Sequence, residues 1–184
     1  PIYETSSPAQ VRHILTDSGA RLVFTGGEKQ RRAVERALDD AEGLDAAELR
    51  LFSMDEPGLA PLTADGASID DAVIEAARST PVRYDLAILV YTSGTTGKPK
   101  GAMHSHGGLV YAMRGYNTLM AQTEHDERMC FLPLCHIAER MGGEYSAMYT
   151  GAVLNFVENP ETVPENVREI APTVFTAVPR VWEK

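Results

Sequence analysis

Cysteine is scarce in this sequence, and the number and spacing of its cysteines argue against three kinds of cysteine chemistry. Only Cys130 and Cys135 are present, within the stretch CFLPLC. Two cysteines cannot build a disulfide framework, and their spacing matches neither a CxxC redox pair nor a metal-ligand pair. We expect free, buried thiols, which suit a reducing, cytoplasmic compartment.

Long apolar runs and basic stripes are also missing. No run of 18 apolar residues occurs, which excludes an ordinary transmembrane helix, and no signal-peptide pattern follows Pro1. The net charge is −9, from 17 Lys and Arg against 26 Asp and Glu. Without a basic stripe, this balance argues against a nucleic-acid partner. A nucleotide stays open, because it needs only a local group of donors.

Acidic residues are absent from one long stretch, Leu86 to Thr123. None of the 26 acids falls in these 38 residues, where an even scatter would place about five. The stretch does carry two lysines, an arginine and two histidines (Lys98, Lys100, Arg114, His104 and His106). A mildly cationic region of this kind tolerates an anionic ligand, but buried strands and helices would lack acids equally well. Charge alone leaves both readings open.

What remains is the pattern of a globular α/β chain. Hydrophobic residues make up 43% and charged residues 23%, as in folded domains. Short apolar runs alternate with helix-period segments, which predicts a mainly parallel sheet with flanking helices. The predicted strands are 21–26, 48–54, 86–91, 101–105, 128–134, 152–157 and 172–178. The predicted helices are 8–18, 28–43, 68–79, 105–121, 136–151, 159–171 and one starting near 178, and residues 54–67 are expected to form a loop.

Helix-capping residues support several of these boundaries. Ser7, Ser68 and Ser105 are expected to cap helices, and Gly19 to end the first one. Because both ends break off inside regular elements, we expect part of a larger domain.

The stretch YTSGTTGKPKG, Tyr91 to Gly101, concentrates groups that bind anions. Glycine lets backbone N–H groups approach an anion closely, and hydroxyls suit a nucleotide that carries Mg²⁺. The hydroxyls are those of Thr92, Ser93, Thr95 and Thr96, the glycines are Gly94 and Gly97, and the charges are Lys98 and Lys100. This loop is a candidate triphosphate site.

Other motifs do not fit this loop. A Walker loop needs wider glycine spacing and a hydroxyl where Pro99 stands, and Pro99 also disfavours a helix beginning at Lys98. The dinucleotide fingerprint G-x-G-x-x-G is not matched, and Ser93 lacks the flanking glycines of a G-x-S-x-G nucleophile elbow. A surface turn that happens to be rich in Gly and Thr is the remaining alternative.

YTSGTTGKPKG resembles, in full, the phosphate-loop signature of the adenylate-forming (AMP-binding) superfamily. GAMHSHGGL is similar to its usual continuation, with Gly108 where many members carry Asn. LPLCHIAER (132–140), PTVFTAVPRVWEK (172–184) and the first 24 residues resemble the long-chain fatty acyl-CoA synthetase branch. The resemblance covers nearly the whole chain and is weakest over 43–81. It implies that residues 1–184 are an incomplete part of the large N-terminal domain of these enzymes, without the C-terminal domain.

The resemblance implies a parent enzyme that is an AMP-forming acid–thiol ligase. Such an enzyme activates a fatty acid with ATP as acyl-adenylate and transfers the acyl group to coenzyme A. Residues Ser93 to Lys98 would then hold the β- and γ-phosphates, with Lys98 and Thr92 catalytic, Lys100 adding charge and Thr92 near Mg²⁺. The resemblance is also compatible with peripheral membrane association of the parent enzyme.

The segment 136–151 adds a second group of candidates. The resemblance implies that His136 lies near the reacting carboxylate, whereas the sequence alone favours a satisfied histidine at a strand end. Gly142 and Gly143 are expected to permit close packing, with room for an alkyl chain as the alternative. Further expectations are a core stripe of Ile137, Met141, Tyr145 and Met148, and a solvated or ion-paired Glu139 and Arg140.

Two more expectations concern what this chain cannot do. His104 and His106 would share one strand face, but no third ligand accompanies them, so a metal pair is rejected. The family motifs that complete the magnesium site, bind ribose and supply a C-terminal lysine are not found after residue 101. We therefore expect the chain alone to be inactive. A non-catalytic truncated nucleotide-binding relative, or a fragment of an adenylation domain for another carboxylic acid, stays open.

Overall fold

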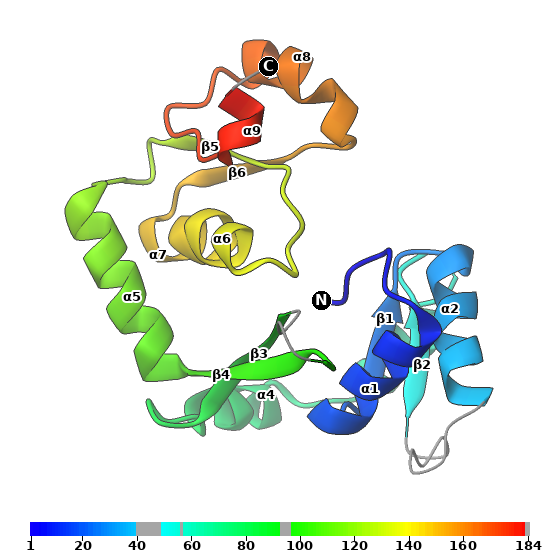
Figure 1. Cartoon of the computed structure of the whole chain (residues 1–184). Helices are drawn as coiled ribbons and strands as arrows, with labels where there is room; N and C mark the ends of the chain where they lie inside the picture. Colours follow the sequence, from blue (N-terminus) through cyan, green and yellow to red (C-terminus); the bar gives the residue numbers. More distant parts are fainter. Residues whose placement is uncertain (40–48, 56, 93–96, 183–184) are drawn as a thin grey trace. The chain divides into compact units, whose positions relative to one another are not determined.

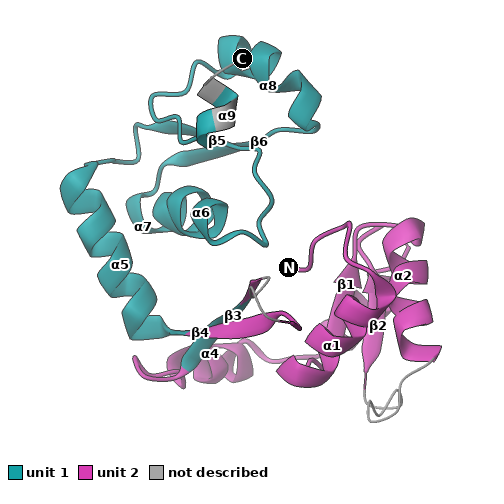
Figure 2. Ribbon diagram, in the orientation of Figure 1, with its two compact units in different colours: residues 1, 86–90, 104–184 teal, residues 2–85, 91–103 magenta. Residues whose placement is uncertain are grey.

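The computed structural model describes residues 1–39, 49–55, 57–92 and 97–182, and it divides into two compact units (Figure 2). Unit 1 comprises Pro1, Leu86–Val90 and His104–Lys184, and unit 2 comprises Ile2–Asp85 and Tyr91–Met103. The boundary between the units therefore runs through two neighbouring strands.

Unit 2 begins with a small α/β layer (Figure 1). Its elements are α1 (Pro8–Ser18), β1 (Leu22–Thr25), α2 (Glu28–Asp39) and β2 (Arg50–Ser53). Strands β1 and β2 are parallel, with Leu22 opposite Arg50 and Thr25 opposite Ser53. The core packs α1 against α2 through Val11, Leu15, Val34 and Ala37.

The predicted ends of α1 are confirmed. The Ser7 hydroxyl accepts from the Gln10 N–H while the Gln10 side chain accepts from the Ser7 N–H, which is a complete capping box. At the other end Gly19 takes the left-handed conformation, φ 63°, that glycine adopts without a steric penalty.

The next segment corrects two expectations. The predicted loop 54–67 contains a helix, α3 (Ala60–Gly66), with a proline in its first turn, where the missing N–H needs no partner. The following helix, α4 (Asp71–Ser79), is capped by Asp70 and not by Ser68, because the Asp70 carboxylate accepts from the Ala72 N–H at 2.7 Å.

Strands β3 (Leu86–Thr92) and β4 (Lys100–Ser105) form a second two-stranded sheet, followed by α5 (His106–Leu119). As predicted, the Ser105 hydroxyl caps α5 by accepting from the Gly108 N–H. This cap makes His106 the first helical residue, so the expectation that His104 and His106 share one strand face is wrong.

Unit 1 continues with a parallel pair, β5 (Glu127–Cys130) and β6 (Val153–Phe156). Between these strands run α6 (Ile137–Glu139), a π-helical segment η1 (Arg140–Tyr145) and α7 (Ser146–Thr150). The chain then forms η2 (Pro160–Thr162), α8 (Val163–Ile170) and α9 (Pro179–Trp182). Among the described helices, none is both long and apolar enough to span a bilayer.

Two predicted strands are shorter than expected. Strand β5 stops at Cys130, ahead of Pro133, which has no N–H for a ladder. Within 172–178 a single parallel bridge joins Val174 to Arg128. The Glu127 N–H donates to the Thr173 hydroxyl rather than to a main-chain carbonyl, so the ladder ends there. The α/β class and the parallel pairing are nevertheless confirmed, as small sheets with helices.

Candidate phosphate-binding site

The described ends of the glycine- and threonine-rich loop lie at the surface of unit 2. Thr92 is the exposed last residue of β3, and Lys98 and Lys100 are exposed on the other side of the loop. Ser93, Gly94, Thr95 and Thr96 lie outside the described residues. Gly97 has φ 124°, a conformation that any side chain would strain. The loop thus ends in a turn that requires glycine.

The described polar groups of this loop are available for a ligand. Within the described part of the chain, the side chains of Thr92, Lys98 and Lys100 form no hydrogen bond or ion pair. Two exposed ammonium groups suit phosphate oxygens, and an exposed hydroxyl suits a hydrated Mg²⁺. The donor set therefore fits a magnesium-bound nucleotide, with Thr92 as the residue that would approach the metal.

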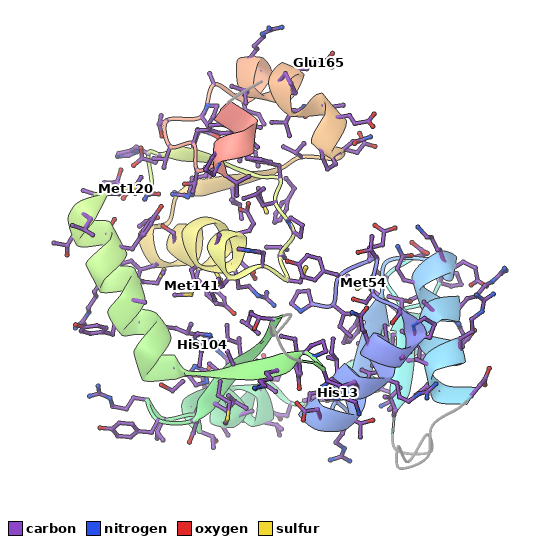
Figure 3. All side chains as sticks on the ribbon, viewed as in Figure 1. His13, Met54, His104, Met120, Met141 and Glu165 are labelled. Atoms are coloured by element: carbon purple, nitrogen blue, oxygen red, sulfur yellow. The ribbon has the colours of Figure 1, made fainter. Side chains whose placement is uncertain are left out.

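Helix α1 contacts both ends of this loop. His13, labelled in Figure 3, bonds through Nε2 to the Pro99 carbonyl oxygen at 2.7 Å. The Tyr91 hydroxyl donates to the Asp17 carboxylate, also at 2.7 Å. Burial, followed by this bond to Asp17, raises the pKa of Tyr91 to about 12, so the phenol keeps its proton and remains a donor.

The structure helps to decide why residues 86–123 contain no acid. Its described buried residues are only Val90, Met113 and Gln122, so burial does not account for the missing acids. Asp17 does approach from α1, but its carboxylate is engaged by the Tyr91 phenol. The surface around Lys98 and Lys100 suits an anion.

His136 lies in unit 1, whereas Thr92 and Lys98 lie in unit 2. It caps α6, with Nδ1 accepting from the Ala138 N–H at 3.1 Å. Because Nδ1 accepts, the neutral ring carries its proton on Nε2. The ring is exposed, with one nitrogen satisfied locally and the other a donor on the surface. That His136 lies near the reacting carboxylate stays a prediction.

A buried carboxylate supports the loop that carries His136. Glu139 is only 4% exposed, and its Oε2 accepts from the Leu132 N–H at 3.1 Å. Burial raises the pKa of Glu139 despite this bond and the nearby Arg128. The expectation of a solvated or ion-paired Glu139 is therefore wrong, while Arg140 does pair with Glu144 at 2.7 Å.

Gly143 makes room for this carboxylate. A Cβ atom at Gly143 would overlap Glu139 Oε1 and lie 3.0 Å from its Cδ atom. Of the two readings of the paired glycines, the structure supports close packing at Gly143. A glycine four residues after an acid on one helix was the signal that could have shown this.

Arg128 is a second buried charge that the sequence did not indicate. It is 2% exposed and donates to Gln122 Oε1, to the Gly142 carbonyl oxygen and to the Thr176 hydroxyl. These bonds join β5 to three other segments of unit 1. Its partners come from positions 122, 142 and 176, so no local pattern predicts the cluster.

The π-helical turn also explains a wrong expectation about the core. Ile137, Met141 and Tyr145 are half-buried, but Met148 is 74% exposed, and Ser146 and Ala147 are buried in its place. The stripe assumed 3.6 residues per turn. A π segment uses more residues per turn, so the inward face shifts after Tyr145.

Neither cysteine forms a disulfide, as expected. Cys130 is buried, and burial, followed by the charge of Glu139, raises the pKa of its thiol to about 12.

Comparison with known proteins extends this description to the whole chain. The sequence matches the family described as "AMP-binding enzyme" over residues 1–184. It is 34% identical over 188 residues to the long-chain-fatty-acid–CoA ligase FadD15 of Mycobacterium bovis, covering 100% of this chain and 31% of that protein. It is 28% identical over 200 residues to the long-chain-fatty-acid–CoA ligase ACSBG1 of Rattus norvegicus, covering 100% of this chain and 27% of that protein.

The chain therefore spans under a third of the length of these two curated relatives. Among solved structures, the inhibitor-bound N-terminal domain of FACL13 from Mycobacterium tuberculosis superposes with a TM-score of 0.80 at 23% identity. That match covers 100% of this chain and 44% of the other. The ATP-bound MatB of Rhodopseudomonas palustris gives a TM-score of 0.76 at 22% identity, over 100% and 34%. These matches confirm the fold of an N-terminal domain of adenylate-forming enzymes.

Proposed function

Since the chain belongs to the AMP-binding enzyme family, we propose that its parent protein is an AMP-forming acid–thiol ligase acting on long-chain fatty acids. Residues 1–184 form part of its N-terminal domain. The choice of acid rests on the two relatives described as long-chain-fatty-acid–CoA ligases. The acid carboxylate attacks the α-phosphate of ATP, which gives acyl-adenylate and pyrophosphate. The thiol of coenzyme A then takes the acyl group and AMP is released.

The observation that carries this proposal is the loop after β3. It presents the Thr92 hydroxyl and the Lys98 ammonium at the surface, with no partner among the described residues. Displacing pyrophosphate from ATP requires that negative charge on the β- and γ-phosphates be held and neutralised. Lys98 supplies that charge, and Lys100 adds to the local field.

The other described candidates have matching tasks. Thr92 would offer its hydroxyl to the phosphates and to the water shell of Mg²⁺, and the ion, when bound, would screen phosphate charge. Gly97, with its positive φ, forms the turn that precedes Lys98 between strands β3 and β4. His136 Nε2–H is a donor suited to one oxygen of the fatty-acid carboxylate.

Substitution of the loop residues in the full-length protein tests the assignment. We expect Lys98→Ala to lower fatty-acid-dependent ATP–pyrophosphate exchange by about 10²- to 10³-fold, the usual effect of removing one transition-state donor. Thr92→Ala should lower it by about tenfold, because a neutral hydroxyl contributes less than a charge. A panel of short, medium and long acids on the wild type checks the substrate class.

Lys29→Ala is the matched control. Lys29 is an exposed lysine of the same unit whose ion pair with Glu4 lies on the surface, so its removal should leave exchange unchanged. If Lys98→Ala and Thr92→Ala both exchange at the wild-type rate, the loop does not hold the phosphates and the assignment is wrong.

A further inference from the structure

We propose that α1 holds the phosphate loop in place from both sides, with His13 and Asp17 as positioning residues for nucleotide binding. Neither residue belongs to the loop sequence, and both precede it by more than 70 positions. The proposal rests on the function assigned above to the loop. It adds which groups outside the loop set its geometry.

His13 fixes the end of the loop that follows Lys98. Its Nε2 lies 2.7 Å from the carbonyl oxygen of Pro99, the residue next to Lys98. A carbonyl oxygen only accepts, so Nε2 carries the proton and donates. The bond is partly buried, which protects it from exchange with water. The Pro99–Lys100 peptide, which directly follows Lys98, is thereby tied to α1.

Asp17 fixes the start of the loop. Its carboxylate accepts from the hydroxyl of Tyr91, the residue next to Thr92. The Tyr91 ring packs over Gly101, where a Cβ atom would lie 3.0 Å from the ring's Cζ atom. Strand β4 thus carries a glycine where the ring must pass to reach Asp17.

The two contacts act from one face of one helix. His13 and Asp17 are four residues apart, which places them on the same side of α1. The two contacts are also joined to each other, since the rings of His13 and Tyr91 meet edge to face with centroids 6.5 Å apart. On α1 itself, Val11 and Leu15 are buried in the core against α2, so the helix is an anchored support.

Anchoring both ends of a binding loop lowers the conformational entropy that ligand binding costs. The nucleotide phosphates gain from this, whereas the proposed function assigns the fatty-acid carboxylate to His136, outside the loop. Loss of either bond should therefore weaken ATP binding and leave the acid unaffected. For one hydrogen bond we expect about a fivefold effect.

The test compares four variants of the full-length ligase. His13→Phe keeps a flat ring beside Tyr91 but removes the donor, and His13→Gln restores a donor. Tyr91→Phe removes a single oxygen, and Asp17→Asn keeps an acceptor. Calorimetry with MgATP gives the affinity, pyrophosphate exchange gives the KM values for ATP and palmitate, and thermal melting gives stability.

We expect His13→Phe and Tyr91→Phe to raise the Kd and KM for ATP about fivefold, with an unchanged KM for palmitate. His13→Gln and Asp17→Asn should stay within about twofold of the wild type. Wild-type ATP affinity in both Phe variants, or equal changes in both KM values, would overturn the proposal that α1 positions the loop. Should His13→Phe fail to fold, Tyr91→Phe decides. A wild-type protein that does not bind MgATP would refute the proposed function itself, and with it the positioning role of His13 and Asp17.

Discussion

At the scale of single residues, Glu139 gives unit 1 a pH-dependent stability. Burial holds the pKa of this carboxyl above its ordinary value of 4.5. The unfolded chain therefore ionises first as the pH rises. The contribution of Glu139 to folding is complete below about pH 4.5 and is lost as the pH climbs through the higher folded-state pKa, with a slope of at most about 1.4 kcal/mol per pH unit.

We expect Glu139→Gln to remove this dependence. The Gln amide oxygen can still accept from the Leu132 N–H, but the side chain no longer titrates. Relative to this variant, the wild type should lose free energy of unfolding as the pH rises above about 4.5. Denaturant titrations across that range measure the difference. The matched control is Glu165→Gln, at an exposed position of α8 (Figure 3), and a constant offset between wild type and Glu139→Gln would contradict the prediction.

The roles of single residues were predictable only where they follow from the local sequence. The hydroxyls and lysines of the loop could be assigned a ligand class from the sequence, because each carries its chemistry alone. The burial of Arg128 and Glu139 could not, since it depends on partners such as Thr176, 48 positions from Arg128. The contact of His13 with Pro99, 86 positions away, is of the same kind.

At the scale of elements, the π-helical segment η1 depends on one glycine. We expect Gly143→Ala to destabilise the protein by about 1–3 kcal/mol, because the new methyl overlaps the Glu139 carboxylate and forces buried groups to shift. Gly142→Ala is the matched control. Its Cβ would meet only Tyr116 and Thr176 atoms at 3.9 and 4.0 Å, which is ordinary contact. Chemical denaturation of both variants measures the difference.

The double variant Glu139→Ala/Gly143→Ala separates the overlap from any backbone effect. If the carboxylate is the obstacle, the cost of Gly143→Ala should shrink once Glu139 is truncated. An equal cost in both backgrounds, or equal destabilisation by Gly142→Ala, would show that the carboxylate does not limit this position.

Element boundaries were predictable where a cap fixes them and not where the helix departs from regular geometry. Ser7, Gly19 and Ser105 mark their helices because their side chains or left-handed backbone act locally. Asp70 displaced Ser68 as a cap since either residue could serve by sequence. The π turn shifted Met148 outward, and no 3.6-residue pattern can anticipate such a turn.

At the scale of the whole molecule, the fold class could be predicted from the alternation of short apolar runs with helix-period segments. The family could be predicted from an eleven-residue stretch, Tyr91 to Gly101. Three-dimensional structure was needed to show that the catalytic candidates and the substrate-binding candidate belong to different units. Thr92 and Lys98 belong to unit 2, and His136 to unit 1.

This division leads to a prediction about the 184-residue chain by itself. Adenylate formation requires the acid and the α-phosphate to be held in attack geometry, and that positioning accounts for much of the rate. The two curated relatives have more than three times the length of the part matched here, and the resemblance places ribose-binding, magnesium-completing and C-terminal lysine groups outside these residues. We therefore expect palmitate-dependent ATP–pyrophosphate exchange by the isolated chain to fall at least about 10³-fold below that of the full-length protein. Calorimetry on the same sample, with Lys98→Ala as the control, should still detect phosphate-dependent binding of MgATP by the loop. Ordinary exchange turnover by the isolated chain would show that these residues contain a complete catalytic site.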